Sequence, residues 1–305
     1  MRNVNPQSEI RNPKSATPIV AVLYGPGINC HEETAFAVEL AGLDAKVVNF
    51  HDVMEGKDAL TKYQALVVPG GFSWGDHLGS GRIFGLHLIA RAADQLRELV
   101  DTGKPILGIC NGFQILVETG LLPDGNVGKR GCALLQNKSA VLESRWVDLL
   151  VTDTNSIWTQ GLEGRILRMP VAHGEGRLFW NAECGTGSAE CEMPSAERGA
   201  RSAESGIPTP NSELRTPNFQ VPTPNSELRT PNSLIRPVVC YAKDGTPTEE
   251  YPACPSGSPG GIAGIRDSTG LIFGLMPHPE RASLPWHGSS DGMEIFTNLA
   301  RYLRT

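Results

Sequence analysis

Short apolar runs alternate along the first half of the chain with longer segments whose apolar residues recur every three or four positions. The short runs are typical of buried parallel strands, and the longer segments are typical of helices packed on a core. The predicted strands are Ile19 to Leu23, Ala45 to Phe50, Ala65 to Val68 and Pro105 to Ile109. The predicted helices are Glu32 to Leu40, Ile83 to Val100 and one that begins after Cys110. This alternation indicates an α/β fold with a mostly parallel sheet covered by helices on both faces.

The rest of the chain adds strands of a different kind. Residues Gly131 to Val151 and Ile262 to Leu275 are predicted to form further strands, and Met293 to Leu303 a closing helix. We therefore expect one domain over residues 18–305, flavodoxin-like in its first half, with an antiparallel extension.

Residues 183–236 interrupt the pattern with seven consecutive seven-residue units, which run from Ser188 to Arg236. A seven-residue period is typical of coiled coils, but the last four units all begin Thr-Pro-Asn, and an interior proline costs about 3 kcal/mol in a helix. The segment has few large apolar side chains, so we expect a disordered low-complexity insertion. A docking segment is the alternative. Residues 1–17 are expected to form a disordered tail, and they lack the apolar core of a secretory signal.

The composition argues against a nucleic-acid-binding, membrane-spanning or metal-binding protein. The 305 residues carry a net charge of −6, which provides no basic surface for nucleic acid, and no apolar run approaches the roughly 18 residues of a membrane span. Seven widely spaced cysteines without a Cys-x-x-Cys pair favour a reducing compartment, so we expect a cytoplasmic protein. The seven histidines lack ligand spacing, and no metal site is expected.

Cys110 is the first candidate for chemistry. It lies where a buried strand turns directly into a helix, and Gly108 and Gly112 flank it at two residues on either side. Small residues at this spacing allow a nucleophile to occupy a strained strand-to-helix turn with its side chain exposed. The N-terminus of the helix favours the thiolate, because its free N–H groups stabilise negative charge. The alternative is an inert cysteine in the core.

A base and its orienting group are available near the C-terminus. His278 stands between two prolines that stiffen the backbone, and Glu280 follows two residues later. His278 could take the thiol proton and return it to a leaving amine, while Glu280 holds the imidazole in the correct tautomer. The N–H groups of Gly70 and Gly71, after another buried strand, could join that of Asn111 in an oxyanion hole. The alternative for this glycine pair is an ordinary turn.

Four sequence blocks stand in order along the chain. They are Gly71-Phe72-Ser73-Trp74-Gly75-Asp76, Gly108 to Gln114, Pro170 to Arg177, and Pro277 to Ala282. Together with Tyr24 to Cys30, the chain resembles the class I (triad) glutamine amidotransferase family, and within it the glutaminase subunits of phosphoribosylformylglycinamidine synthase. The resemblance covers residues 18–182 and 237–304.

The resemblance implies roles for the catalytic residues. Cys110 would attack the carboxamide of glutamine to form a thioester, with His278 as base and acid and Glu280 as its orienting group. The amides of Gly71 and Asn111 would form the oxyanion hole.

The resemblance also covers four further residues, for which the sequence gives no chemical role. Gln114 would lie close to the bound glutamine. His173, Glu175 and Arg177 belong to a block typical of this subfamily, and its glycines predict a tight loop that faces either a partner or the substrate.

A partner is also implied. The chain contains no Gly-x-x-x-x-Gly-Lys-Ser/Thr phosphate loop, so no cofactor is expected on it, and ammonia would pass to a synthetase subunit that holds ATP and Mg²⁺. That partner could be one large synthetase or a smaller one with an accessory subunit. Two other functions are considered, a class I glutaminase of another pathway and a non-catalytic regulatory module. The subfamily blocks argue against the first, and the intact Cys110, His278 and Glu280 argue against the second.

Overall fold

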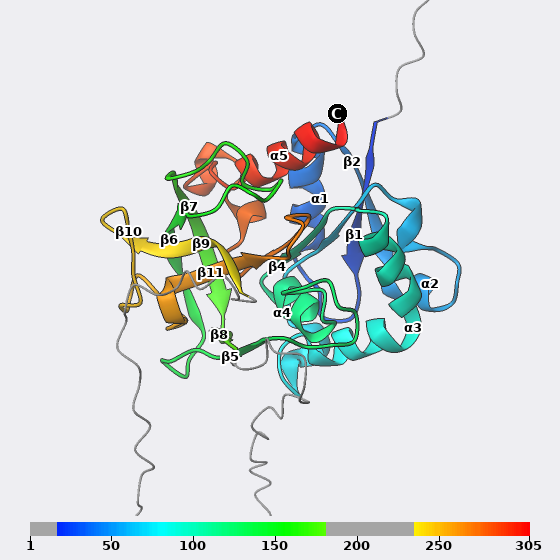
Figure 1. The fold of residues 1–305 in the computed structure, drawn as a ribbon, viewed down its shortest axis with the longest axis horizontal. Coiled ribbons are helices and arrows are strands. Elements are labelled where there is room, and N and C mark those ends of the chain that lie inside the picture. The colour runs from blue at the N-terminus through cyan, green and yellow to red at the C-terminus, as the bar shows by residue number, and fades with distance from the viewer. Residues whose placement is uncertain (1–16, 181–234) are drawn as a thin grey trace, which may run out of the picture. The chain divides into compact units, whose positions relative to one another are not determined.

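A computed structural model describes residues 17–180 and 235–305 (Figure 1). The predicted N-terminal tail and the repeat insertion lie outside the described residues, apart from position 17 and the last two positions of the insertion. Arg236, which the repeat analysis assigns to the insertion, instead begins strand β9. Proline 237 and the valines after it are therefore part of the sheet rather than of the repeat.

A large mixed sheet forms the framework, with the strand order β2-β1-β3-β4-β12-β11-β9-β6-β7. Its parallel half comprises β2 (Asp44–Asn49), β1 (Ile19–Tyr24), β3 (Ala65–Val68), β4 (Ile106–Ile109) and β12 (Ile272–Leu275). The helices are α1 (His31–Leu40), α2 (Phe50–Met54), α3 (Arg82–Asp101), α4 (Asn111–Glu118) and α5 (Met293–Leu303). Every residue of β3, β4 and β12 is buried, as expected for parallel strands with helices on both faces.

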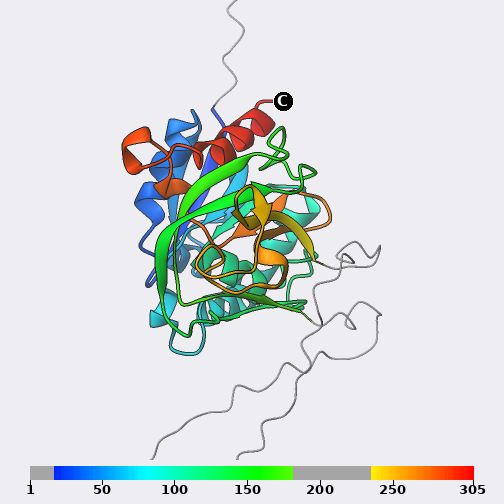
Figure 2. The same cartoon turned by 90° about the vertical axis from the view of Figure 1, so that its left-hand side faces the viewer.

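The antiparallel half continues the same sheet. It comprises β11 (Ile262–Arg266), β9 (Arg236–Lys243), β6 (Glu143–Val151) and β7 (Ile166–His173), with the short β10 (Thr246–Pro247) paired to β9. A separate two-stranded sheet pairs β5 (Ala133–Gln136) with β8 (Glu175–Phe179). Figure 2 views the molecule from the side of the antiparallel half, with the long green strands β6 and β7 and the yellow β9–β10 segment in front of the blue parallel strands.

Short 3₁₀ turns connect several of these elements. They are η1 (Leu60–Lys62), η2 (Ser73–Asp76), η4 (Pro259–Gly261), η5 (Pro279–Arg281) and η6 (Pro285–His287). Two of them, η2 and η5, lie in the loops that follow the parallel strands β3 and β12, at the carboxyl edge of the sheet.

The α/β architecture with an antiparallel extension is confirmed. The strand Ala65–Val68 and the helix Met293–Leu303 have the predicted bounds, and the other predicted elements differ by one or two residues at their ends. One prediction was wrong. The block from His173 to Arg177 is not a charged loop, because β7 ends at His173 and β8 begins at Glu175, which leaves only Gly174 as the turn. Within the described residues, no helix is both long and apolar enough to cross a bilayer.

Candidate active site

The site is built at the carboxyl ends of four neighbouring parallel strands. The chain leaves β4 at Cys110, β12 just before His278, β3 just before Gly70, and β1 before the turn that contains Cys30. The carboxyl edge of a parallel sheet is where such folds bind ligands, because the connecting loops converge there. Residues from nearly the whole length of the chain are thereby brought together.

Cys110 lies on a strained turn. Its backbone has φ 51° and ψ −107°, and it immediately precedes the first residue of α4. Gly112 makes this turn possible, since a Cβ at that position would overlap the carbonyl oxygen of Val68. Cys110 is 4% exposed, and its Sγ lies 3.5 Å from the carbonyl oxygen of Ala172 on β7. The predicted strained strand-to-helix turn is therefore present, but the side chain of Cys110 is buried rather than exposed, because Ala172 of β7 lies against it. Its role as nucleophile stays a prediction.

His278 and Glu280 form a buried pair. The Nδ1 of His278 lies 2.6 Å from Oε1 of Glu280, and the side chains are 2% and 0% exposed. The extended backbone at His278, between its two prolines, is the conformation that Pro279 favours in the preceding residue. The peptide N–H of His278 donates to the carbonyl oxygen of Pro170 at 2.9 Å. These contacts fix the position of the imidazole.

The remaining ring nitrogen of His278 is the one available to a nucleophile. Nε2 is buried and makes no hydrogen bond within the described residues, while the Cys110 and Cys30 thiols both interact with the ring. Burial acts to lower the pKa of His278, but the charges of Glu280 and Cys110 outweigh it and hold the pKa well above its ordinary value. The ring is therefore a base that Glu280 strengthens.

Gly71 and Asn111 lie on two segments that contact each other, and their role as an oxyanion hole stays a prediction. A Cβ on Gly71 would overlap the carbonyl oxygen of Gly27, so only glycine allows the loop after β3 to pack this closely. The side chain of Asn111 fastens the same loop to α4, because its Oδ1 accepts from the N–H of Ser73 at 3.2 Å. The two peptide N–H groups thus belong to segments that are tied to each other beside Cys110.

Gln114 and Glu175 are linked in the same region. Gln114 Nε2 donates to the carbonyl oxygen of Glu175 at 2.5 Å, and its Oε1 accepts from Asn111 at 2.9 Å. The Glu175 carboxylate in turn accepts from the N–H of Ser80 at 2.9 Å. Gln114 therefore positions the start of β8 in this structure, and its contact with glutamine stays a prediction.

His173 is a buried neutral residue rather than part of an exposed loop. Its Nδ1 lies 3.0 Å from Oδ1 of Asn137, and its Nε2 lies 3.4 Å from the hydroxyl of Tyr241. Burial, with a smaller contribution from the nearby His278, lowers the pKa of His173 to about 3. Asn137 also accepts from the N–H of Gly176 and donates to the carbonyl oxygen of His173. His173 and Asn137 together hold the β7–β8 turn.

A cavity of about 220 Å³ opens next to this turn. Its lining consists of Phe72, Asp76, Ser80, Gln136, Ala140, Val141, Leu142, Gly174 and Glu175. Burial raises the pKa of the Asp76 carboxyl, and the neighbouring Glu175 carboxylate adds to this shift. Two carboxyl groups in one cavity favour a ligand that carries a positive charge. Arg177 lies one step farther along β8, opposite Leu135, and does not line the cavity.

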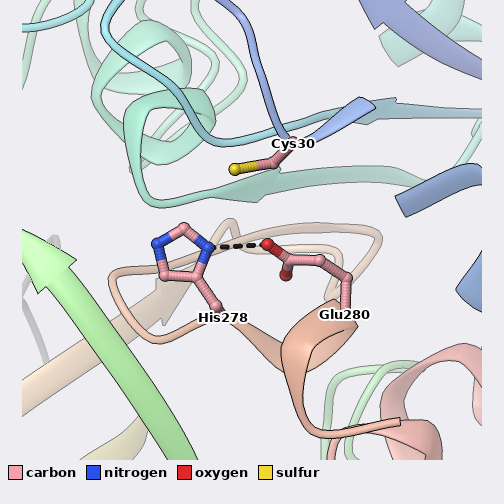
Figure 3. A group of neighbouring side chains, drawn as sticks. All are labelled: Cys30, His278 and Glu280. Carbon is pink, nitrogen blue, oxygen red and sulfur yellow. Dashed lines mark hydrogen bonds and ion pairs between the residues drawn. The ribbon is translucent and has the colours of Figure 1, made fainter. Parts of the chain in front are cut away.

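Cys30 lies beside the His278–Glu280 pair, which the sequence did not indicate. It is 1% exposed, and its Sγ accepts from Nη2 of Arg281 at 3.1 Å. Cys30 Sγ, a ring nitrogen of His278 and a Glu280 oxygen all lie within 4.8 Å of one another, a set of ligand types that suits a divalent metal (Figure 3). Asn137 and Tyr241 were also missed, because a single buried polar side chain outside a sequence block gives no periodic signal. Asp76 stands in the first block, but no role was predicted for it.

The chain matches the family model of a CobB/CobQ-like glutamine amidotransferase domain over residues 17–191 and 217–303. The phosphoribosylformylglycinamidine synthase subunit PurQ of Pyrococcus furiosus is 35% identical, covering 93% of this chain and 98% of the relative. The corresponding subunit of Methanococcus maripaludis strain C5 is also 35% identical, over 87% of this chain and 83% of the relative.

Solved structures agree with this assignment. A chain of the PurLQS structure from Thermotoga maritima superposes with a TM-score of 0.66 at 29% identity, covering 94% of this chain and 99% of that chain. A GMP synthase-like protein from Thermoplasma acidophilum has a TM-score of 0.51 at 14% identity, covers 95% of this chain and 97% of its own, and shows the shared fold alone. The described fold, the arrangement around Cys110 and these similarities lead to one conclusion: the chain belongs to the PurQ family of glutamine amidotransferases.

Proposed function

We propose that this chain is the glutaminase subunit of phosphoribosylformylglycinamidine synthase and that Cys110, His278 and Glu280 are its catalytic residues. The observation that carries the proposal is the strained turn at Cys110 beside the buried His278–Glu280 pair. Because this arrangement occurs in a member of the PurQ family, it supports hydrolysis of glutamine to glutamate and ammonia.

The reaction uses the groups in sequence. The Cys110 sulfur attacks the carboxamide carbon of glutamine while its proton passes to Nε2 of His278. The N–H groups of Gly71 and Asn111 stabilise the oxyanion of the tetrahedral intermediate. When this intermediate collapses, His278 returns the proton to the leaving nitrogen, which departs as ammonia, and a thioester remains on Cys110. Water, deprotonated by His278, then hydrolyses the thioester to glutamate and regenerates the thiol.

The cavity beside the β7–β8 turn is the proposed binding site for the α-amino and α-carboxylate groups of glutamine. The carboxyl groups of Asp76 and Glu175 give it negative charge, which is complementary to the α-ammonium group of the substrate. Gln114 would act here by holding Glu175 in place. These assignments rest on the shape and charge of the cavity.

The ammonia would be consumed by a synthetase partner. We propose that this partner binds ATP and Mg²⁺ and uses ammonia for the amidation of formylglycinamide ribonucleotide in purine biosynthesis, in the cytoplasm. An accessory third subunit is consistent with the PurLQS assembly of the relative from Thermotoga maritima. The block from His173 to Arg177 would act within the glutaminase site through His173 and Glu175, and Arg177 is proposed to face the partner.

Replacement of the nucleophile tests the proposal. Cys110→Ala should abolish glutamine hydrolysis and leave ammonia-dependent amidation by the assembled complex intact, because only the thioester step is lost. Cys132→Ala and Cys240→Ala are matched controls, since both cysteines are buried away from His278 and should keep most of the activity. A glutamine-analogue electrophile should label wild-type protein once. Stoichiometric labelling of the Cys110→Ala variant would refute the assignment.

A further inference from the structure

We propose that Cys30, His278 and Glu280 form a binding site for Zn²⁺, and that occupation of this site blocks the glutaminase reaction. The three side chains come from different parts of the chain, Cys30 from the turn before α1 and the other two from the segment after β12 (Figure 3). Thiolate, imidazole and carboxylate are the three side-chain ligand types that zinc takes in proteins. The site overlaps the catalytic pair but adds a residue that the reaction does not use.

The ligand atoms are already gathered. Cys30 Sγ, a His278 nitrogen and a Glu280 oxygen lie within 4.8 Å of one another. Around a tetrahedral zinc ion with bonds of about 2.0 to 2.3 Å, ligand atoms lie about 3.4 to 3.8 Å apart. Small side-chain rotations therefore suffice to bring the three atoms onto one ion.

The thiol of Cys30 and the ring of His278 both lie against Gly70. A Cβ on Gly70 would lie 2.8 Å from Cε1 of His278, 3.2 Å from Cys30 Sγ and 3.4 Å from Nδ1 of His278. Because residue 70 has no side chain, the thiol and the Nδ1 edge of the ring face the same space. Glu280 reaches this edge as well, since its Oε1 lies 2.6 Å from Nδ1. The ion would replace the proton that these two atoms now share.

Glu280 has a spare oxygen for the ion. Oε2 is buried and has no hydrogen-bond partner within the described residues, and Glu280 is 1% exposed. A buried carboxylate oxygen without a donor is costly, because it has lost its hydration without replacement. A bound cation would compensate this loss.

The charge balance is also favourable. With the thiolate of Cys30 and the carboxylate of Glu280, the ligands supply two negative charges to a divalent ion. Arg281, which donates to Cys30 Sγ, is the nearby cation that opposes binding, and its guanidinium Nε is paired with Glu33 at 2.7 Å. The positive charge of Arg281 is thus already balanced by a carboxylate outside the ligand set.

Binding would stop catalysis through His278. The ion forms bonds to Cys30 Sγ, whose thiol proton goes to solvent, and to Nδ1, so that the metal-bound imidazole carries its one hydrogen on Nε2. Nε2 then carries a hydrogen and cannot accept the proton of Cys110. This inhibition rests on the proposed glutaminase function, whereas binding of the ion does not.

Cobalt provides a spectroscopic test, because Co²⁺ replaces Zn²⁺ with the same ligands and a thiolate ligand gives it a strong near-ultraviolet absorption band. We expect one equivalent of Co²⁺ to give this band in the wild type and in Cys110→Ala. The band should be absent in Cys30→Ser and present in the control Cys254→Ser. Zn²⁺ should inhibit the wild-type glutaminase, and a chelator should restore its activity. The Zn²⁺ concentration that halves the activity should be at least tenfold higher for Cys30→Ser than for the wild type, with each protein compared with its own rate in the absence of Zn²⁺.

The outcomes separate the alternatives. A band that persists in Cys30→Ser and disappears in Cys110→Ala would place the ion on the nucleophile and overturn the proposal, and so would the absence of any band in the wild type. If Cys30→Ser does not give a native circular dichroism spectrum, Cys30→Ala takes its place with the same expectation. A wild-type protein that binds Co²⁺ through Cys30 but hydrolyses no glutamine would refute the proposed function and leave the metal site standing.

Discussion

At the scale of single residues, Cys110, the proposed nucleophile, is held in a conformation that costs energy. Cys110 has a positive φ, which a residue with a Cβ adopts at a cost of about 1 to 3 kcal/mol. The sequence could predict this turn because its requirements are local: a buried strand, a helix that follows directly, and glycines at 108 and 112. It could not predict Cys30 beside His278, since these residues are far apart in the sequence and their contact depends on how β1 and β12 are placed on either side of β3 and β4.

The strain at Cys110 can be measured with two inactive variants. Glycine reaches this backbone conformation freely, whereas alanine does not, so Cys110→Gly should be more stable than Cys110→Ala by about 1 kcal/mol. This difference in unfolding free energy is smaller than the strain energy at position 110, because glycine loses more chain entropy on folding than alanine does. Denaturant unfolding of both variants gives the difference directly. An alanine variant as stable as the glycine variant would mean that position 110 is unstrained.

Glu280 supplies charge to His278 as well as orientation. In Glu280→Gln the charge that raises the pKa of His278 is lost, so this pKa should fall and the imidazolium formed during catalysis should be less stable. We expect kcat/KM for glutamine to decrease by about 10² to 10⁴ while ammonia-dependent amidation by the complex is unchanged. Glu163→Gln, at an exposed position, is the control for the same chemical change. A loss of less than tenfold would argue against Glu280 as the third member of the triad.

At the scale of elements, the junction of β7 and β8 shows where sequence interpretation fails. The two glycines and the residues His173, Glu175 and Arg177 predicted a loop. Instead, β7 pairs with β6 and β8 pairs with β5, so that only one residue separates the end of β7 from the start of β8. Asn137, immediately after β5, satisfies the polar groups of the short turn between them. Both pairings and the Asn137 contacts are long-range, so local propensity carried no information about them.

The buried His173 makes stability depend on pH in a definite direction. Its folded pKa of about 3 lies below the unfolded value near 6.5, so the unfolded chain binds the extra proton between these values. The stability contribution is complete above pH 6.5 and is lost as the pH falls, by about 2 kcal/mol at pH 5. His173→Gln cannot take up this proton, so its unfolding free energy should decrease less between pH 7 and 5 than that of the wild type. Parallel pH dependence in both proteins would show that His173 is protonated in the fold.

At the scale of the whole molecule, the parallel and antiparallel strands of the large sheet both contribute residues to one site. The parallel half presents Cys110, Gly71 and the His278 segment at adjacent strand ends, and the antiparallel half places Ala172 of β7 beside Cys110. Glu175 comes from the separate β5–β8 sheet and contacts Gln114. Sequence periodicity predicted β1, β2, β3 and β4 to within one residue, because alternation of strands and helices is typical of a parallel sheet. It predicted neither α2 nor the place of β12 beside β4. The order β11-β9-β6-β7 was not predictable, since antiparallel neighbours can be combined in many ways and Ile262 pairs with Cys240 across a long connection.

A partner that binds at the cavity entrance, beside Phe72, would change the rate of glutamine hydrolysis. Phe72 directly follows Gly71, lines the cavity and is 45% exposed, while its N–H donates to the carbonyl oxygen of Gly27 at 2.8 Å. A synthetase that covers Phe72 would change the loop that carries one oxyanion donor, and one such donor is worth about 10² to 10³ in rate.

The free glutaminase should therefore hydrolyse glutamine slowly and accelerate by about 10²-fold when the synthetase binds, because releasing ammonia without an acceptor serves no reaction. In Phe72→Ala the basal rate should change little, since the backbone donor remains, but the stimulation should fall at least tenfold at saturating synthetase. Steady-state glutaminase assays with and without the partner measure both quantities. A free glutaminase as fast as the complex would refute coupling altogether, whereas full stimulation of the variant would move the contact away from Phe72.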